Sequence, residues 1–527
     1  MNNKKIQTAL PILFAIAVVL GMFVGYKLHG NMPTSRNLFN TTGINKMDEV
    51  LGLVKQRYVE TVNIDSISEI AIEEMLTTLD PHSVYIPSSS LNEINEDLEG
   101  RFEGIGVEFN NFNDTVHILS VLPNGPAAKA NLMIGDRILK VDDSLAVGDI
   151  ETTRFKSWVK GPAGTEVKLM LERDKKIIYK TVVRGSIPIV SIDAAYMIDD
   201  QKGYIRLNRF SGSTYEEFMK SLESLKAKGL KSLVLDLRDN GGGILEEAVD
   251  IADEFIGNNN LIVYTEGKNS PKKEYICKRP GLFEEGELVV LMNEGSASAS
   301  EVLAGALQDL DRAVIVGRRS FGKGLVQEQY TLSDGSALRL TVAKYYTPLG
   351  RSIQRSYKNG NQAYQNEVLK RFHNEEGQKT DTSSANHAKK FKTASGKLLY
   401  GGGGITPDVF VAIDTTYFDT SINKFYVKNT IGNFSYNFFM DNKGTFKQYK
   451  TTDDFVRNFS LPENILEQLN QFAKRDSIVA SPTNAASKQF LKTRIKALIA
   501  RILWDENGYY QVVNGEDETF RKAVRKG

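Results

Sequence analysis

One stretch of the chain combines an apolar strand, a turn of small residues and a helix, and it constrains the fold more than any other. Leu288–Met292 is an uninterrupted apolar run of the length of a buried strand. A turn rich in Gly, Ala and Ser follows, and Val302–Leu307 then carries a helical apolar pattern. Strands and helices alternate in the same way from about Pro188 onward, with a strand at Gly203–Leu207 and a buried strand at Leu233–Arg238. This alternation is typical of an α/β core.

The turn places Ser298 where the helix is expected to begin, and this position allows two interpretations. In the first, Ser298 and Glu301 form a capping box that only closes the first turn of the helix. In the second, Ser298 is a nucleophile, because the free N–H groups and the dipole at a helix N-terminus favour developing negative charge. A serine hydroxyl needs a neighbouring base in order to react. Lys323, between two glycines in a second turn, can be that base if burial lowers its pKa.

The two turns together carry a longer pattern. Gly295–Glu301 reads G-S-A-S-A-S-E, and Phe321–Gln327 reads F-G-K-G-L-V-Q. In this wording the chain resembles the carboxy-terminal processing (tail-specific) peptidases, whose lysine follows the serine by 25 positions, as Lys323 follows Ser298 here. The resemblance implies a crotonase-like, ClpP-related peptidase core. It also implies that Ser298 is the nucleophile, that Lys323 is the base, and that Gln327 orients the amine.

A third glycine-rich turn, Asp239–Gly243, follows one of the buried strands. It contains neither G-x-G-x-x-G nor G-K-[ST], so no nucleotide site and no cofactor are predicted. The segment instead resembles the L-D-L-R-x-N-x-G-G motif of the same family. That resemblance implies an oxyanion hole formed by the backbone N–H groups of Gly242 and Ala299, with Gly241 or Gly243 as alternatives for the first donor.

Short strands and glycine turns between Gly100 and Arg184 indicate a small β-domain. The order of its segments resembles a PDZ domain, with a Gly-Ile-Gly-Val loop, the turn Pro123–Leu132 and the turn and strand Ile134–Val141. In PDZ domains the free N–H groups of such a loop bind a C-terminal carboxylate, while the edge strand pairs with the peptide. The resemblance therefore implies that substrate tails bind at Gly104, Ile105, Gly106 and Val107.

The N-terminus predicts a membrane anchor. Lys4 and Lys5 precede an apolar stretch from Leu10 through Tyr26, which is close to the ~20 residues that span a bilayer as a helix. A cleaved signal peptide is the competing interpretation, but the segment Gly21–Met32 contains no convincing A-x-A site. Basic residues before the span predict a cytoplasmic N-terminus and a periplasmic catalytic part at a bacterial inner membrane.

Composition excludes several other classes of protein. The chain of 527 residues has 66 basic and 65 acidic side chains, so nothing predicts a nucleic-acid partner. Its one cysteine excludes an intramolecular disulfide and offers no metal-binding pattern, so no metal site is expected. Two functions remain. The first is an anchored serine endopeptidase that recognises C-terminal tails through its PDZ domain and cleaves through an acyl-enzyme, and the second is a catalytically silent PDZ scaffold.

The intact set Ser298, Lys323 and Gln327 favours the peptidase, and the sequence leaves a homo-oligomer or an adaptor open. The segment Leu79–Tyr85 also resembles a family phrase that precedes the PDZ domain. The expected parts are a membrane anchor at 1–30, a helical region at 31–98, the PDZ domain at 99–187, the peptidase core at 188–357, a polar linker at 358–397, a final core segment at 398–413 and a mixed C-terminal domain at 414–527. The segment 358–397 is expected to be a polar linker or a disordered insertion, because its centre, Glu375–Ala394, is rich in polar residues.

Overall fold

The computed structural model describes residues 46–526 except 113, 149, 374–388, 418–419 and 479–483. The chain divides into two compact units, Met1–Met75 and Leu76–Gly527. Helix α2 (Lys46–Arg57) and most of α3 (Ile64–Thr77) belong to the first unit. The predicted membrane anchor at 1–30 lies outside the described residues. Within the described ranges, no helix is both long enough and apolar enough to cross a membrane.

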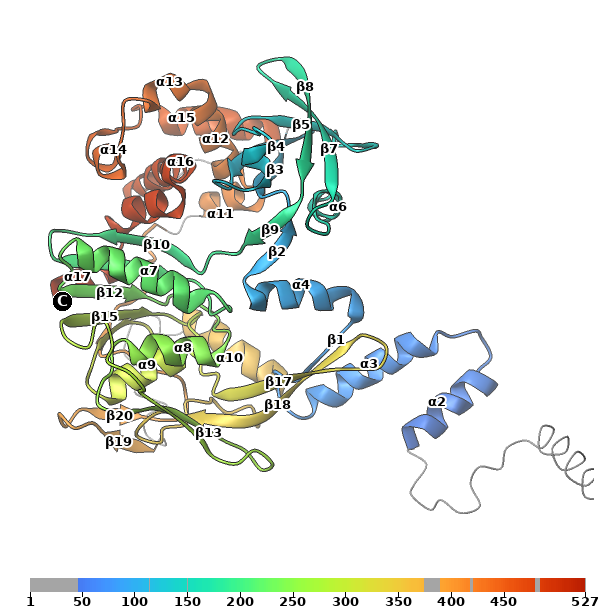
Figure 1. Ribbon diagram of the computed structural model, residues 1–527, viewed down its shortest axis with the longest axis vertical. Helices are drawn as coiled ribbons and strands as arrows, with labels where there is room; N and C mark the ends of the chain where they lie inside the picture. Colours follow the sequence, from blue (N-terminus) through green and yellow to red (C-terminus); the bar gives the residue numbers. More distant parts are fainter. Residues whose placement is uncertain are drawn as a thin grey trace, which may run out of the picture. The chain divides into compact units, whose positions relative to one another are not determined.

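A six-stranded sheet forms the centre of the described second unit. Its order is β10-β11-β12-β15-β16-β21, with β10 antiparallel to β11 and all other neighbours parallel. The strands are β10 (Ile192–Met197), β11 (Lys202–Leu207), β12 (Ser232–Asp236), β15 (Glu287–Met292), β16 (Val314–Gly317) and β21 (Val409–Phe410). The predicted α/β core is therefore confirmed (Figure 1).

Helices cover both faces of this sheet, which explains why the middle residues of β12 and β15 are apolar on both faces. On one face, Leu233 and Leu235 pack in the same core as the apolar side chains of three helices. These helices are α7 (Thr214–Ala227), α8 (Leu245–Asp253) and α9 (Ala299–Asp309). On the other face, Val234 packs with Phe520 and Ala523 of α17 (Glu518–Lys526). A segment from the C-terminal part of the chain thus completes the peptidase core.

A second, antiparallel sheet contains the strand that follows the turn of Lys323. It runs in the order β1-β18-β13-β14, and β17 pairs with β18. Its strands are β1 (Val84–Ile86), β13 (Leu261–Glu266), β14 (Lys273–Ile276), β17 (Leu325–Thr331) and β18 (Ala337–Tyr346). Because β1 pairs with β18, the end of the segment Leu79–Tyr85 belongs to this sheet even though the segment precedes the PDZ domain in sequence.

The PDZ domain is a separate sheet with the order β3-β4-β5-β7-β8, in which β6 pairs with β5. Strand β3 ends this order, so one of its edges has no partner strand among the described residues. Its elements are β3 (Val107–Phe112), β4 (Thr115–Val121), α5 (Pro126–Lys129), β5 (Arg137–Val141), β6 (Ser144–Leu145), α6 (Thr152–Val159), β7 (Glu166–Arg173) and β8 (Lys176–Val183). A ribbon of β2 (Arg101–Gly104) and β9 (Gly185–Pro188) joins the domain to the core.

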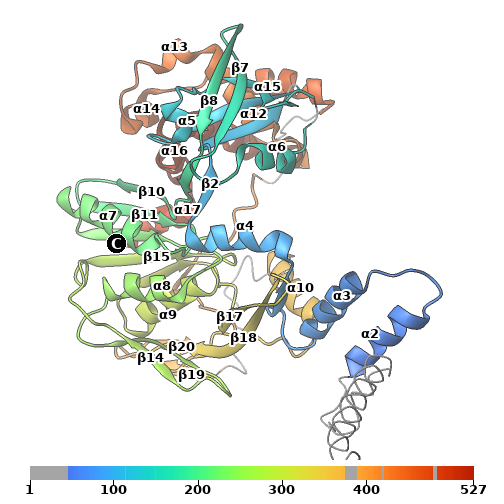
Figure 2. The same ribbon diagram turned by 45° about the vertical axis from the view of Figure 1, so that its right-hand side comes forward.

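The C-terminal domain, expected to be mixed, has only helices among its described elements after β21. They are α11 (Thr420–Val427), α12 (Thr430–Asp441), α13 (Lys443–Phe446), α14 (Thr452–Asn458), α15 (Ile465–Ala473), the short helix η3 (Lys474–Asp476) and α16 (Ala485–Asn514), before α17. Figure 2 shows α12 and α16 beside the PDZ strands. The contact includes a 2.6 Å hydrogen bond from Asn110 Nδ2 to Asn433 Oδ1 and an ion pair between Arg501 and Glu108.

The segment 358–397, expected as a polar linker, contains helix α10 (Asn361–His373) and strand β19 (Lys390–Lys392), which pairs with β20 (Leu398–Tyr400). Residues 374–388 lie outside the described part. The described part of this segment is therefore partly regular structure, and α10 buries two of its side chains, Tyr364 and Arg371. Arg371 is 7% exposed, binds Glu367 at 2.9 Å, and donates to the carbonyl of Ser320 at 2.7 Å.

Candidate active site

Ser298 occupies the sharp turn between strand β15 and helix α9. Its backbone has φ 55° and ψ −115°, a conformation that non-glycine residues rarely adopt and that stores strain. The Ala297 N–H donates to the carbonyl of Asn240 at 2.9 Å, and the Ser298 N–H donates to Oε2 of Glu301 at 2.9 Å. A strained strand-to-helix turn of this kind projects the serine hydroxyl outward from the end of the sheet.

One large groove collects the predicted catalytic residues from four parts of the chain. Its volume is about 1420 Å³, and Ser298, Ala299, Gly242, Lys323 and Gln327 all line it. None of the hydrogen bonds found among the described residues joins the Ser298 hydroxyl directly to the Lys323 amine. Catalytic hydrogen bonds are often long in structures without substrate, so this geometry is compatible with a serine and its base.

The Lys323 amine is held on its other side by Gln327. Lys323 Nζ donates to Gln327 Oε1 at 2.8 Å, and Gln327 Nε2 donates to the carbonyl of His82 at 2.5 Å. Burial lowers the pKa of Lys323, and the positive charge of Arg339 lowers it further, whereas Asp80 and Glu301 act in the opposite sense. The environment therefore favours the neutral amine more than water does.

The segment that supports Gln327 is Asp80–Tyr85. The Asp80 carboxylate accepts the N–H groups of His82 at 2.8 Å and Ser83 at 2.9 Å, which closes a tight turn. The His82 ring nitrogen Nε2 lies 2.9 Å from the hydroxyl of Tyr364 in helix α10. Burial, together with the charge of Lys323, lowers the pKa of His82 to about 4. His82 is therefore neutral near pH 7, and its carbonyl, not its ring, contacts Gln327.

Glu301 joins the serine turn to the lysine turn. Its side chain is completely buried, and Oε2 accepts the N–H groups of both Ser298 at 2.9 Å and Lys323 at 2.8 Å. Oε1 accepts the N–H of Gly322 at 2.7 Å and the hydroxyl of Ser320 at 2.5 Å. Burial raises the pKa of Glu301 to about 7, although these four hydrogen bonds favour the ionised form. The sequence identified this residue only as a helix cap.

Tyr345 bridges the same two turns from the carbonyl side. Its hydroxyl lies 2.9 Å from the carbonyl oxygen of Ser298 and also contacts the carbonyl oxygen of Lys323. The side chain is buried, and burial raises the pKa of the phenol well above its usual value, so the hydroxyl keeps its proton. Together, Glu301 and Tyr345 fix the spacing between the two reactive turns.

Gly242 lies directly against the serine turn. A Cβ at this position would approach Ser298 Cβ to 2.7 Å and the Ala299 nitrogen to 2.9 Å, so only glycine fits. Its φ of 95° is also a conformation that favours glycine. The Gly242 N–H, however, donates to Asn240 Oδ1 at 2.9 Å in this structure. The predicted first oxyanion donor is thus engaged here, and Gly241 and Gly243 remain alternatives.

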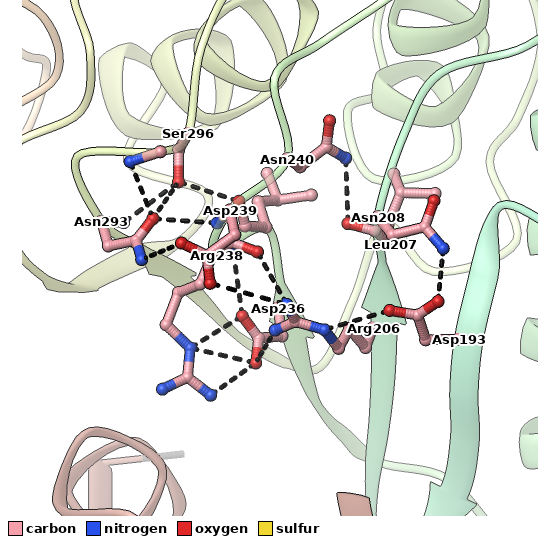
Figure 3. A network of polar contacts seen from close by, with 12 residues as sticks. Asp193, Arg206, Leu207, Asn208, Asp236, Arg238, Asp239, Asn240, Asn293 and Ser296 are labelled. Carbon is pink, nitrogen blue, oxygen red and sulfur yellow. Dashed lines mark hydrogen bonds and ion pairs between the residues drawn. The ribbon is translucent and has the colours of Figure 1, made fainter. Parts of the chain in front are cut away.

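A buried polar network fastens the glycine turn to the serine turn (Figure 3). Asn293 accepts the N–H of Asp239 at 2.9 Å through Oδ1 and donates to its carboxylate at 2.7 Å through Nδ2. The hydroxyl of Ser296 donates to the carbonyl of Leu237 at 2.8 Å, and that of Ser300 donates to the carbonyl of Asn240 at 2.9 Å. Ser296 and Ser300 are therefore committed to structure, while Ser298 faces the groove.

The charged part of this network lies under the glycine turn. Asp236 is completely buried, and burial alone would raise its pKa, but Arg238 and Arg206 hold the pKa well below its usual range. The Arg206 guanidinium lies between Asp193 and Asp236 (Figure 3). Arg238 also pairs with Asp517, which precedes helix α17. The C-terminal domain thus contacts the support of the candidate oxyanion loop.

The predicted tail-binding loop lines a second, smaller pocket. Gly104, Ile105, Gly106 and Val107 border a cavity of about 210 Å³ together with side chains of β3 and α6. Gly106 has φ 76°, and its carbonyl accepts the N–H of Leu122 at 3.0 Å, which fixes the loop. Helix α4 (Ser88–Glu99), which the sequence did not connect with this site, forms another wall of the pocket.

Comparison with family models matches most of the chain in segments. The model of peptidase family S41 matches residues 201–360, and that of the PDZ domain matches 104–182. The N-terminal domain of the activating protease CtpB matches residues 25–90, and a family of unknown function matches 421–505. The expected peptidase and PDZ domains are thereby confirmed.

Curated relatives span the same region. The carboxy-terminal-processing protease of Bartonella bacilliformis is 36% identical over 350 residues, which cover 64% of this chain and 80% of that protein. A probable CtpA-like serine protease of Staphylococcus aureus is 33% identical over 344 residues, covering 65% of this chain and 68% of that protein. Among solved structures, the photosystem II D1 C-terminal processing protease is 27% identical, covers 70% of this chain and 86% of its own, and has a TM-score of 0.37.

Proposed function

We propose, from the premise that the chain belongs to peptidase family S41, that Ser298, Lys323 and Gln327 are the catalytic set of a membrane-anchored endopeptidase. Family membership makes the protein a carboxy-terminal-processing serine peptidase with a PDZ domain. The PDZ domain binds the C-terminal tail of a protein substrate, and the groove that holds Ser298 cleaves the chain of the same substrate.

The chemistry assigns one step to each residue. Ser298 Oγ attacks the carbonyl carbon of the peptide bond while neutral Lys323 takes the hydroxyl proton. Backbone N–H groups, those of Ala299 and Gly242 or a neighbouring glycine, stabilise the oxyanion. The protonated lysine then gives its proton to the leaving amine, which leaves an acyl-enzyme on Ser298. Water, deprotonated by Lys323, hydrolyses that ester and restores the serine.

The observation that carries this assignment is the chain of contacts from Lys323 to Gln327 to His82. It holds a largely buried amine in the same groove as Ser298, and burial lowers the pKa of that amine. The other candidate, a silent PDZ scaffold, has no use for a strained serine turn or for a buried lysine with a depressed pKa. Strain and desolvation both cost stability, and such costs are typical of functional sites.

The direct test replaces Ser298 by Ala and measures cleavage of an unstructured protein by mass spectrometry. We expect loss of cleavage with an unchanged circular dichroism spectrum. Ser296→Ala and Ser300→Ala are matched controls from the same turn. Both should retain measurable activity because their hydroxyls make structural hydrogen bonds, that of Ser296 with Leu237 and Asn293 and that of Ser300 with Asn240. Full cleavage by the Ser298→Ala protein would leave the scaffold as the better description.

We further propose that residues 1–30 anchor the protein in a bacterial inner membrane with its catalytic part in the periplasm. The support is the apolar stretch Leu10–Tyr26 after Lys4 and Lys5. Extraction of membranes with alkaline carbonate tests the anchor. An uncleaved anchor keeps the full-length protein in the pellet, whereas a cleaved signal peptide releases a shorter protein whose N-terminal sequence begins after the apolar stretch.

A further inference from the structure

The tail pocket has a wall that does not belong to the PDZ domain. Helix α4, which precedes β2, contributes Glu93, Glu96 and Asp97 to the lining of the 210 Å³ cavity. The PDZ domain contributes two cations to the same lining, Lys156 within α6 and Lys160 directly after it. The pocket thus brings carboxylates of α4 to the place where a substrate carboxylate is expected.

Lys160 lies next to the predicted carboxylate-binding loop. A Cβ built on Gly104 would lie 3.8 Å from the Lys160 Cα, so the two backbones are neighbours. The Lys160 amine lies 5.0 Å from the centre of the Phe102 ring, and that ring would be 3.2 Å from the same Cβ. The side chain of Lys160 therefore extends along the strand that leads into the loop.

The basic residue that the sequence places before the loop does not take this position. Arg101 is exposed, pairs with Glu99 at 3.5 Å, and lines a different cavity. Lys160 instead makes a 2.6 Å ion pair with Glu96, and the two side chains are 34% and 30% exposed. Asp97 of the same helix is paired elsewhere, with Arg209 at 3.2 Å. The Lys160 amine in the tail pocket is thus already paired with a carboxylate of the chain itself, that of Glu96.

We propose that Lys160 binds the free C-terminal carboxylate of a substrate tail, and that Glu96 is an internal carboxylate which the tail displaces from it. The inference rests on the proposed tail recognition by the PDZ domain. A partly exposed ion pair contributes little to stability, so exchanging one carboxylate for another at Lys160 costs little. The apolar side chains of Ile105, Val107 and Val159 line the same pocket and favour an apolar last residue. Glu96 contributes no such apolar surface, and this difference favours the tail.

The test measures binding in the full chain with Ser298→Ala, so that cleavage does not interfere. The probe is a short fluorescein-labelled peptide that ends in valine, with a free carboxylate or as the amide, and the readout is anisotropy. Lys160→Met should weaken binding of the free acid about tenfold, the effect of one charge-assisted hydrogen bond, and leave the amide unchanged. Glu96→Gln should strengthen binding of the free acid about two- to fivefold, because the competitor has lost its charge.

Matched controls separate this role from a general effect of charge. Lys156→Met and Glu93→Gln alter the same pocket walls and should each change binding of the free acid by less than about twofold. The proposal is overturned if Lys160→Met binds both peptides as the parent does, if Glu96→Gln weakens binding of the acid, or if Lys156→Met has the same effect as Lys160→Met. A parent protein that binds acid and amide equally would instead refute the proposed tail recognition itself, whatever the two variants do.

Discussion

The catalytic groove and the tail pocket use their charged groups in opposite ways. In the groove, Glu301 is completely buried and accepts four hydrogen bonds from two turns. In the tail pocket, the ion pair of Lys160 and Glu96 is about one-third exposed and joins elements from two domains. Buried, fully bonded groups hold reactive atoms in fixed positions, whereas exposed pairs exchange partners easily. The difference suits catalysis at one site and recognition at the other.

The sharpest test of this contrast is Lys323→Arg. Arginine keeps the positive charge but cannot give up its proton near neutral pH, so we expect turnover to fall at least about 10³-fold, as for Lys323→Ala. Binding of the free-acid peptide should not change, because Lys323 lines only the catalytic groove of the two sites. Peptide cleavage and anisotropy measured on one preparation decide the matter, and turnover near that of the parent would exclude a proton-accepting role.

Glu301→Gln should have the next largest effect. The amide cannot accept all four hydrogen bonds, so the two turns lose their fixed spacing, and we expect kcat to fall about 10²-fold, as when catalytic geometry is disturbed by about 1 Å. The remaining activity should show a shifted pH profile. Activity rises with pH as Lys323 loses its proton, and the Glu301 charge raises the Lys323 pKa. The variant should therefore reach its plateau at lower pH than the parent.

A merely structural role for Glu301 predicts the loss of activity without that displacement of the pH profile. Glu301→Asp supplies the control, because it keeps the charge while shortening the side chain. Glu301→Asp should lose activity, but its activity should rise over the same pH range as that of the parent. Profiles of kcat/KM against pH for the three proteins separate the two cases, provided that thermal melts show each of them folded.

Gln327→Ala should have a smaller effect, about a tenfold loss of kcat, because it removes one hydrogen bond to the base. The amine stays in place but loses its orientation, so KM for a peptide should change little. Gln329→Ala, two residues further along β17, is the control. An equal loss in both variants would indicate damage to the strand and not to the base.

The smallest expected effect is on the free energy of unfolding, and it distinguishes Lys323 in the groove from Lys160 in the tail pocket. Because burial lowers the pKa of Lys323, the folded state disfavours the charge that the unfolded chain carries. Lys323→Met should therefore unfold at higher urea concentration than the parent at neutral pH. The parent gains stability as the pH rises from the pKa of Lys323 in the folded state toward the ordinary pKa of lysine. The difference in stability between Lys323→Met and the parent should therefore disappear over that pH range. Lys160→Met, at an exposed ion pair, should show no such pH-dependent gain.

The sequence predicted the catalytic turns because their residues are close together along the chain. Ser298, Lys323 and Gln327 belong to short phrases, and the strands beside them are apolar runs. It missed the function of Glu301, whose cap pattern explains the bond to Ser298 but not the bonds to Gly322 and Lys323. Those bonds depend on the contact between the serine turn and the lysine turn, and no local sequence pattern predicts that contact.

The missed elements share a physical cause. Helix α10 has the composition of a linker, and the contacts that hold it, such as those of buried Arg371 with Glu367 and with the carbonyl of Ser320, follow no local pattern. The wall of the tail pocket joins Glu96 to Lys160 across a long stretch of chain. The residues of α17 that cover the sheet, Phe520 and Ala523, stand in a helix without a motif. Each contact is a property of the tertiary structure, which one-dimensional periodicity cannot represent.

The position of α17 has a consequence for how the peptidase is made. A ribosome produces the chain from its N-terminus, so Val234 and Val289 emerge long before Phe520 and Ala523, which share their core. Until those last residues are synthesised, one face of the catalytic sheet has an uncovered apolar surface and Arg238 lacks Asp517. A nascent chain that contains Ser298, Lys323 and Gln327 therefore still lacks part of the core that supports the glycine turn.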